Sequence, residues 1–187
     1  MRTIPDPGFA GDDGSAPKRL TEALSVYQQD PDGGYLPALA ALCGARLLVP
    51  VLAVLDEVPA TSDSGGPGGP EEEKSSAMPA SGSEGSEHVE MAAVLIQRPD
   101  GRKALLAFTS SQSLTGWNAD ARPVPVTAAT AALAAAQEDA DALLVDLAGP
   151  VRLVVEGEDL AALARGWKLV ALDDDASAGW GWETDVH

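Results

Sequence analysis

Two apolar runs flank a Pro-Asp-Gly turn in the segment Met91–Trp117, the most informative stretch of the chain. An Asp-Gly pair between strands favours a tight turn, because Gly101 adopts a positive φ at no steric cost, so we predict a β-hairpin. The second run ends at Phe108. The hydroxyl side chains that follow, Ser110 among them, are suited to cap a short helix that carries Leu114. The segment is therefore expected to form strand, turn, strand and capped helix.

Upstream of this hairpin, apolar residues recur at helical spacing from Leu20 to Tyr27 and again from Leu36 to Leu42. The turn-forming residues 30–34 separate the two segments, so we predict two helices, the second with Pro37 in its first turn. The apolar run of residues 46–55 predicts a buried strand. Because Pro50 lacks an amide donor, we expect that strand to lie at a sheet edge or to be bulged.

Downstream of the hairpin, Arg122–Val126 predicts a short strand that its prolines confine to the margin of a sheet. Thr127 then caps an alanine-rich helix. The runs 142–147 and 151–155 flank a Gly-Pro turn and predict a second hairpin. Hairpins with helices between them indicate an α+β fold, in which an antiparallel or mixed sheet is built from hairpins and covered by helices.

Charged residues in this second half have expected positions of their own. Asp146 and Arg152, on the two strands of the second hairpin, are expected to face outward as solvated charges. Glu158 lies at the start of a last helix, where the helix dipole favours an acidic side chain.

Composition suggests where the domain begins and ends. Residues 1–17 are rich in Gly, Asp and Pro and are expected to be a flexible arm, and residues 18–172 hold the domain. Within it, residues 58–88 are mostly Gly, Pro, Ser and Glu. They offer little apolar surface to offset the entropy of ordering them, so we expect a disordered insertion between two strands.

Residues 173–187 are expected to form an acidic, glycine-rich tail whose removal leaves the domain folded. Its two tryptophans, Trp180 and Trp182, have few apolar neighbours in the sequence. Two interpretations stay open. The tail is either a docking motif for a basic partner with a groove, or a segment that folds back over an apolar patch of its own domain.

The formal net charge of −17 at pH 7 argues against nucleic acid and against an anionic membrane surface as partner. The single cysteine, Cys43, excludes a disulfide framework and a thiolate metal site. The two histidines, His88 and His187, lie beside the low-complexity segment and at the last position. We therefore expect no cofactor, no metal and no catalytic residues. No apolar segment suits a signal peptide or a membrane span, so the expected location is cytoplasmic.

Several short segments together share their order and spacing with one known family: Arg46–Pro50, Pro99–Arg102, Ala107–Ser110, Leu114, Trp117 and Arg122–Val124. They resemble the N-terminal domain of SseB-family proteins, which are named after enhanced serine sensitivity. The similarity extends from about Leu20 to Leu169. It implies an α+β fold and an accessory, largely uncharacterised role, and it carries over no catalytic residue.

We accordingly expect a non-catalytic accessory domain that acts through contacts with a protein partner, with Trp180 and Trp182 as the candidate anchors. A small-ligand or anion-binding regulatory domain is the alternative, and a hydrolase is a third possibility. In the alternative, the Ser110 region binds a small anion together with Arg102 and Arg122. Ordinary helix capping also explains the hydroxyl side chains around Ser110.

Overall fold

The computed structural model describes the backbone of residues 9, 11–55, 89–174 and 177–184, and the side-chain environments of residues 9, 11–52, 92–172 and 179–184. The insertion expected at residues 58–88 lies outside the described residues, as do residues 1–8 of the expected arm. The chain divides into two units, Met1–Leu52 with Ala92–His187 and Ala53–Met91. The helices and strands belong to the first unit, except that two strands, residues 46–55 and 89–93, have residues in both units.

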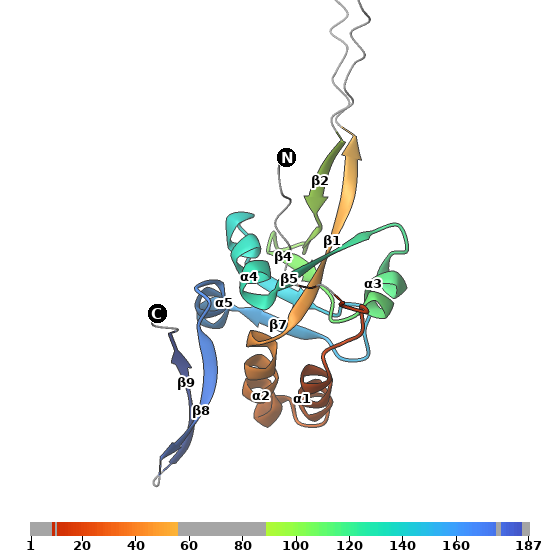
Figure 1. Ribbon diagram of the computed structural model, residues 1–187. Coiled ribbons are helices and arrows are strands. Elements are labelled where there is room, and N and C mark those ends of the chain that lie inside the picture. The colour runs from red at the N-terminus through yellow and green to blue at the C-terminus, as the bar shows by residue number, and fades with distance from the viewer. Residues whose placement is uncertain (1–8, 10, 56–88, 175–176, 185–187) are drawn as a thin grey trace, which may run out of the picture. The chain divides into compact units, whose positions relative to one another are not determined.

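The described residues form five helices: α1 (Lys18–Gln29), α2 (Pro31–Cys43), α3 (Ser111–Trp117), α4 (Ala128–Gln137) and α5 (Gly157–Ala164). They also form nine strands: β1 (Arg46–Leu55), β2 (Val89–Ala93), β3 (Leu95–Gln97), β4 (Lys103–Ala107), β5 (Arg122–Thr127), β6 (Ala142–Val145), β7 (Leu153–Glu156), β8 (Lys168–Asp174) and β9 (Ser177–Glu183). The strand orders are β2-β1-β5, β3-β4-β6-β7 and β8-β9. Figure 1 shows β8 and β9 side by side. Strands β4 and β6 are parallel whereas β3–β4 and β6–β7 are antiparallel, which confirms an α+β fold with a mixed sheet.

Both predicted hairpins are present. In the first, β3 pairs with β4, and the Arg98 amide donates to the Arg102 carbonyl at 2.9 Å across the turn. Gly101 has φ 89°, the positive value expected of it. In the second, β6 pairs with β7. Ser110 is the N-cap of α3 and accepts the Ser113 amide at 3.0 Å, so ordinary capping explains at least this hydroxyl.

The connection between α1 and α2 differs from the prediction. Helix α2 begins at Pro31, so the residues expected to separate the helices form its first turn. Asp30 caps this turn by accepting the Gly33 amide at 3.1 Å. Gly34 allows the helices to approach closely, because a Cβ there would lie 2.5 Å from the Tyr27 Cα. Gly34, one of the residues that suggested a break, therefore serves helix packing.

Of the two alternatives expected at Pro50, an edge strand or a bulge, the edge strand is wrong, because β1 lies between β2 and β5. The Pro50 carbonyl accepts the Val94 amide at 3.2 Å, on the side away from β5. Pro50 faces Pro123 in the β1–β5 register, so neither ring nitrogen is needed as a donor there. Strand β5 does lie at the edge of its sheet, as its prolines predicted.

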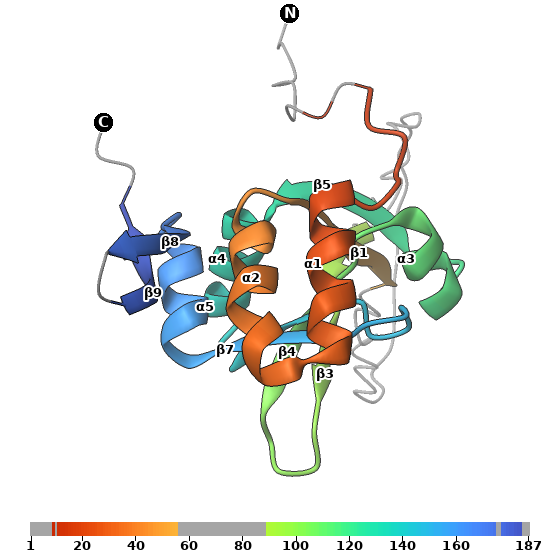
Figure 2. The same cartoon turned by 90° about the horizontal axis from the view of Figure 1, so that it is seen from below.

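Buried side chains gather on both sides of the four-stranded sheet. On one side, leucines and alanines of α1, α2, α4 and α5 pack against Leu105 and Leu143 of the sheet. Figure 2 shows α1 and α2 side by side in front of these strands. On the other side a smaller cluster joins Phe108 to Leu48 and to Leu114 of α3. This second cluster covers only part of its face.

The two ends of the domain are better attached than the composition suggested. Arg46 binds Asp12 through Nε at 2.6 Å and the Ser15 carbonyl through Nη2 at 2.6 Å, which ties the described part of the arm to β1. At the other end, β9 pairs with β8, with Trp182 opposite Leu169. Trp182 packs against the larger core cluster, so β9, within the expected tail, agrees with the interpretation of a segment that folds back onto the domain. Residues 175–176 and 185–187 lie outside the described residues.

Candidate functional site

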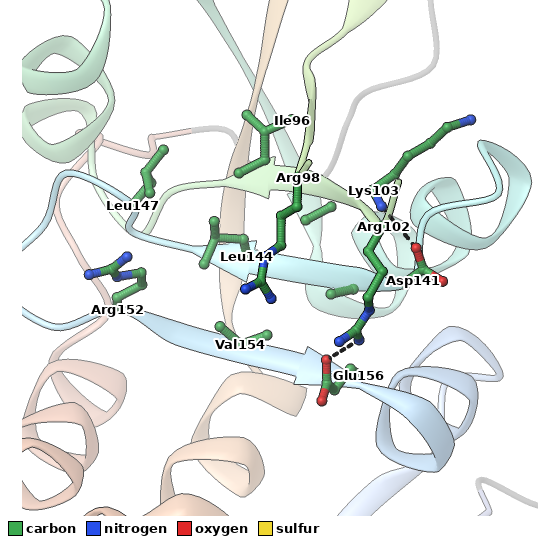
Figure 3. A pocket seen from close by; sticks show the side chains of 12 residues that line it. Ile96, Arg98, Arg102, Lys103, Asp141, Leu144, Leu147, Arg152, Val154 and Glu156 are labelled. Carbon is green, nitrogen blue, oxygen red and sulfur yellow. Dashed lines mark hydrogen bonds and ion pairs between the residues drawn. The ribbon is translucent and has the colours of Figure 1, made fainter. Parts of the chain in front are cut away.

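The uncovered part of the four-stranded sheet is a candidate binding surface. Successive side chains of a strand point to opposite faces, so residues next to the core-facing leucines point to the other side. On that side an apolar floor lies beneath a hollow of about 410 Å³ (Figure 3). We call this floor the open face; it consists of Ile96, Ala104, Ala142, Leu144 and Val154. It draws on all four strands of the sheet.

The floor is only partly shielded from solvent. Leu144 is buried against the smaller core cluster, whereas Val154, on the edge strand β7, is 40% exposed. The hollow is therefore a shallow apolar surface bounded by an exposed strand, which suits an extended molecule better than an enclosed small ligand.

Basic side chains surround the open face. Four of the twelve Lys and Arg residues of the chain line the hollow: Arg98, Arg102, Lys103 and Arg152. The acidic residues in the lining are Asp141 and Glu156. The lining thus carries a local excess of positive charge in a chain whose formal net charge is −17.

These basic side chains are engaged to different degrees. Arg102 Nη2 lies 2.6 Å from Glu156 Oε2, and Figure 3 shows Lys103 pointing away from the hollow. Arg98 extends over the floor toward Leu144 in the same view. Among the described residues, the guanidinium groups of Arg98 and Arg152 have neither an ion pair nor a hydrogen bond. Two cationic groups are therefore available to an anionic partner.

The anion site expected from Arg102, Ser110 and Arg122 is not assembled as a unit. Arg102 precedes β4 and Ser110 follows it, so roughly 25 Å of extended chain separates them. Arg122 belongs to β5, in a different sheet, where it pairs with Val51. Of the three residues, only Arg102 borders the open face.

The two tryptophans of the expected tail also have different environments. They lie on one face of the β8–β9 hairpin, since their partners Leu169 and Ala171 alternate along β8. Trp182 is half-buried against the core, whereas Trp180 is 37% exposed. Of the two interpretations, folding back onto the domain therefore holds for Trp182.

Asp146 does not face outward as expected, and Arg98 lines the hollow although it was not among the expected site residues. The Asp146 side chain is 2% exposed and accepts both the amide and the hydroxyl of Thr109, so it is not an outward-facing charge. Arg152 is exposed, as expected. One pattern in the sequence could have indicated the open face. Arg152, Val154 and Glu156 alternate along the chain, which puts their side chains on the same side of the sheet.

Cys43, in the described part of the chain, lacks the environment of a nucleophilic cysteine. Burial raises the pKa of the Cys43 thiol, whereas a nucleophilic cysteine needs a lowered pKa. No cluster of three or more His, Cys, Asp or Glu side chains in the described part of the chain is arranged to hold a metal ion. None of the described helices combines the length and the apolar character that crossing a bilayer requires.

Comparison with known proteins places the chain in a family. No curated protein and no solved structure gives a significant match. The family model described as the SseB protein N-terminal domain matches residues 20–162, which include the two predicted hairpins and all the residues of the open face. The chain therefore belongs to the SseB family.

Proposed function

We propose that this SseB-family domain is a non-catalytic binding module that contacts an acidic segment of a protein partner through its open face. The observation that supports the proposal is that the guanidinium groups of Arg98 and Arg152, beside an apolar floor, have no ion pair or hydrogen bond within the described part of the chain. Guanidinium groups bind carboxylates by charge-assisted hydrogen bonds. Apolar side chains of the same segment cover the floor.

The charge of the chain makes this arrangement selective. The formal net charge of −17 opposes the approach of acidic molecules to the chain as a whole, so an acidic segment is attracted only where cations gather. The partner therefore needs both carboxylates, for the arginines, and apolar side chains, for the floor that includes Val154. Candidate anchors expected earlier, Trp180 and Trp182, are not required for this contact.

A small anionic ligand is the second candidate. The volume of about 410 Å³ falls within the range of small-molecule pockets. Such pockets commonly enclose most of their ligand, whereas the edge residue Val154 is 40% exposed here. This exposure favours an extended segment that continues beyond the hollow. A competition experiment with inorganic phosphate distinguishes the two candidates. If phosphate does not displace a bound acidic peptide, the result supports an acidic protein segment over a small anionic ligand.

The proposal is tested with the full chain and a short fluorescent peptide of alternating glutamate and valine, followed by fluorescence anisotropy. The double change Arg98→Ala with Arg152→Ala should weaken binding roughly tenfold, which corresponds to about 1.4 kcal/mol. Arg122→Ala is the matched control, since it removes an exposed arginine from another sheet. Equal weakening by the control, or no binding of the peptide at all, would contradict the proposal.

A further inference from the structure

The ion pair between Arg102 and Glu156 crosses one end of the open face. Arg102 directly precedes β4, Glu156 is the last residue of β7, and β6 lies between these strands. In the sheet register Ala104, Ala142 and Glu156 are neighbours. The two alanine methyl groups are small, so the sheet register lets the Arg102 side chain pass over them. Figure 3 shows Arg102 reaching Glu156.

The exposure of this ion pair allows another carboxylate to replace Glu156 on Arg102, and it limits what the pair contributes to stability. Nη2 and Oε2 are 2.6 Å apart, but the side chains of Arg102 and Glu156 are 46% and 53% exposed. Ion pairs this exposed contribute little to the stability of a protein. A new carboxylate that replaced Glu156 would leave Arg102 with an equivalent bond, so the exchange is nearly neutral in free energy.

Glu156 also differs from the other acidic residue of the lining. Asp141 accepts the backbone amide of Lys103 at 2.8 Å and so helps to hold β4 in place. The Glu156 carboxylate has Arg102 as its one bonded group among the described residues. It can therefore rotate away without breaking any bond of the sheet.

From these observations we infer that Glu156 occupies, in the free domain, the position on Arg102 that a carboxylate of the acidic partner takes on binding. The inference rests on the proposed function and adds a specificity-determining residue to it. Glu156 repels an acidic segment that cannot reach Arg102. A segment that places its own carboxylate there displaces Glu156 and gains a third guanidinium contact besides Arg98 and Arg152.

The test uses the same glutamate–valine peptide and the full chain. Glu156→Gln frees Arg102 of its competing charge and should tighten binding about two- to fivefold, as expected for the removal of one exposed ion pair. Glu22→Gln, on α1, makes the same change of charge at an exposed position and should leave the affinity unchanged. Adding Arg102→Ala to Glu156→Gln should abolish the gain, since Arg102 is then absent.

The outcomes separate this inference from the proposed function. A gain in peptide affinity that depends on Arg102 supports the inference on Glu156. The same holds if the Glu156→Gln version is the only one that binds the peptide measurably. Unchanged or weaker binding by Glu156→Gln, or a gain that persists without Arg102, overturns it; the proposed function still stands if Arg98 and Arg152 are required. Absence of binding in every version overturns both. Thermal unfolding midpoints equal to that of the wild type verify that each version is folded.

Discussion

Thr109 donates its hydroxyl to Asp146 Oδ2 at 2.6 Å and its amide to Asp146 Oδ1 at 2.9 Å. The two residues follow the carboxyl ends of the parallel strands β4 and β6. Both are buried, with exposures of 4% and 2%. Asp146 has φ 55°, a left-handed conformation that aspartate adopts more readily than most residues. The bonds hold the ends of these strands together, next to the start of α3.

Replacing Thr109 with valine keeps the shape of the side chain and removes the hydroxyl donor. Asp146 Oδ2 then loses this bond in a buried site, so the free energy of unfolding should fall by about 1–3 kcal/mol. Thr115→Val is the control, because Thr115 is exposed on α3 and should change stability by no more than about 0.5 kcal/mol. Urea titrations of the two variants compare them directly. Equal stabilities would mean that the Thr109 hydroxyl contributes nothing.

The same site predicts a dependence on pH. Burial raises the pKa of the Asp146 carboxyl above its ordinary 3.8, and hydrogen bonds from Thr109 and Ser113 offset part of the rise. Between 3.8 and the raised pKa, the folded state therefore holds this proton more tightly than the unfolded chain does. Ionisation of Asp146 thus lowers stability as pH increases through this window, and the loss is complete above the raised pKa.

Asp146→Asn isolates this contribution, because asparagine does not titrate and other acidic groups are common to both proteins. The stability of the wild type relative to the variant should fall as pH rises through the window, and should then level off. Urea unfolding of both proteins at a series of pH values measures the difference. A difference that stays constant, or that rises with pH, is incompatible with a raised pKa at Asp146.

Phe108 anchors the smaller core cluster. Its side chain is fully buried, and its ring centroid lies 5.6 Å from that of Trp117. Phe108→Ala should lower the free energy of unfolding by about 3–5 kcal/mol, through lost transfer energy and a cavity. Calorimetry or urea titration measures the effect. An unchanged unfolding midpoint would show that the stability of the smaller core cluster does not depend on the Phe108 ring.

The β8–β9 hairpin gives a contrast between neighbouring tryptophans. Trp182→Ala should destabilise the domain by about 2 kcal/mol, less than for a fully buried ring, because Trp182 is half-buried against the core. Trp180→Ala should have a smaller effect, since that side chain is 37% exposed. Removal of residues 173–187 is accordingly expected to destabilise the domain, contrary to the sequence-based expectation. Equal effects of the two substitutions would contradict this assignment.

Local sequence patterns predicted the turns, the helix caps and most of the helices and strands, because these structures depend on residues that are neighbours in the chain. The turn at Gly101 and the cap at Ser110 follow from backbone conformations that few residue types favour. Residues brought together from distant segments were not predictable in this way. Asp146 lies beyond the end of β6, where alternation no longer applies, and its partner is 37 positions away. Hydrophobic periodicity alone also does not reveal that β4 pairs in parallel with β6.

The candidate site was difficult to predict for the same reason. Arg98 and Arg152 belong to different hairpins, and they border one surface only because β4 and β6 are adjacent and in the observed register. Trp182 could be assigned to a tail because the sequence does not show that Leu169 is its cross-strand partner. Each error concerns an environment made by strand pairing rather than by local sequence.

In the proposed function, an acidic segment binds the open face and not the β8–β9 hairpin. Titrating the isotope-labelled full chain with the glutamate–valine peptide, and following the amide chemical shifts by NMR, locates the contact. We expect the largest changes at Ala104, Leu144 and Val154, with the Arg98 and Arg152 side-chain signals shifting in parallel. Changes confined to the hairpin around Ala171 and Trp180, with the open face unaffected, would contradict binding at the open face.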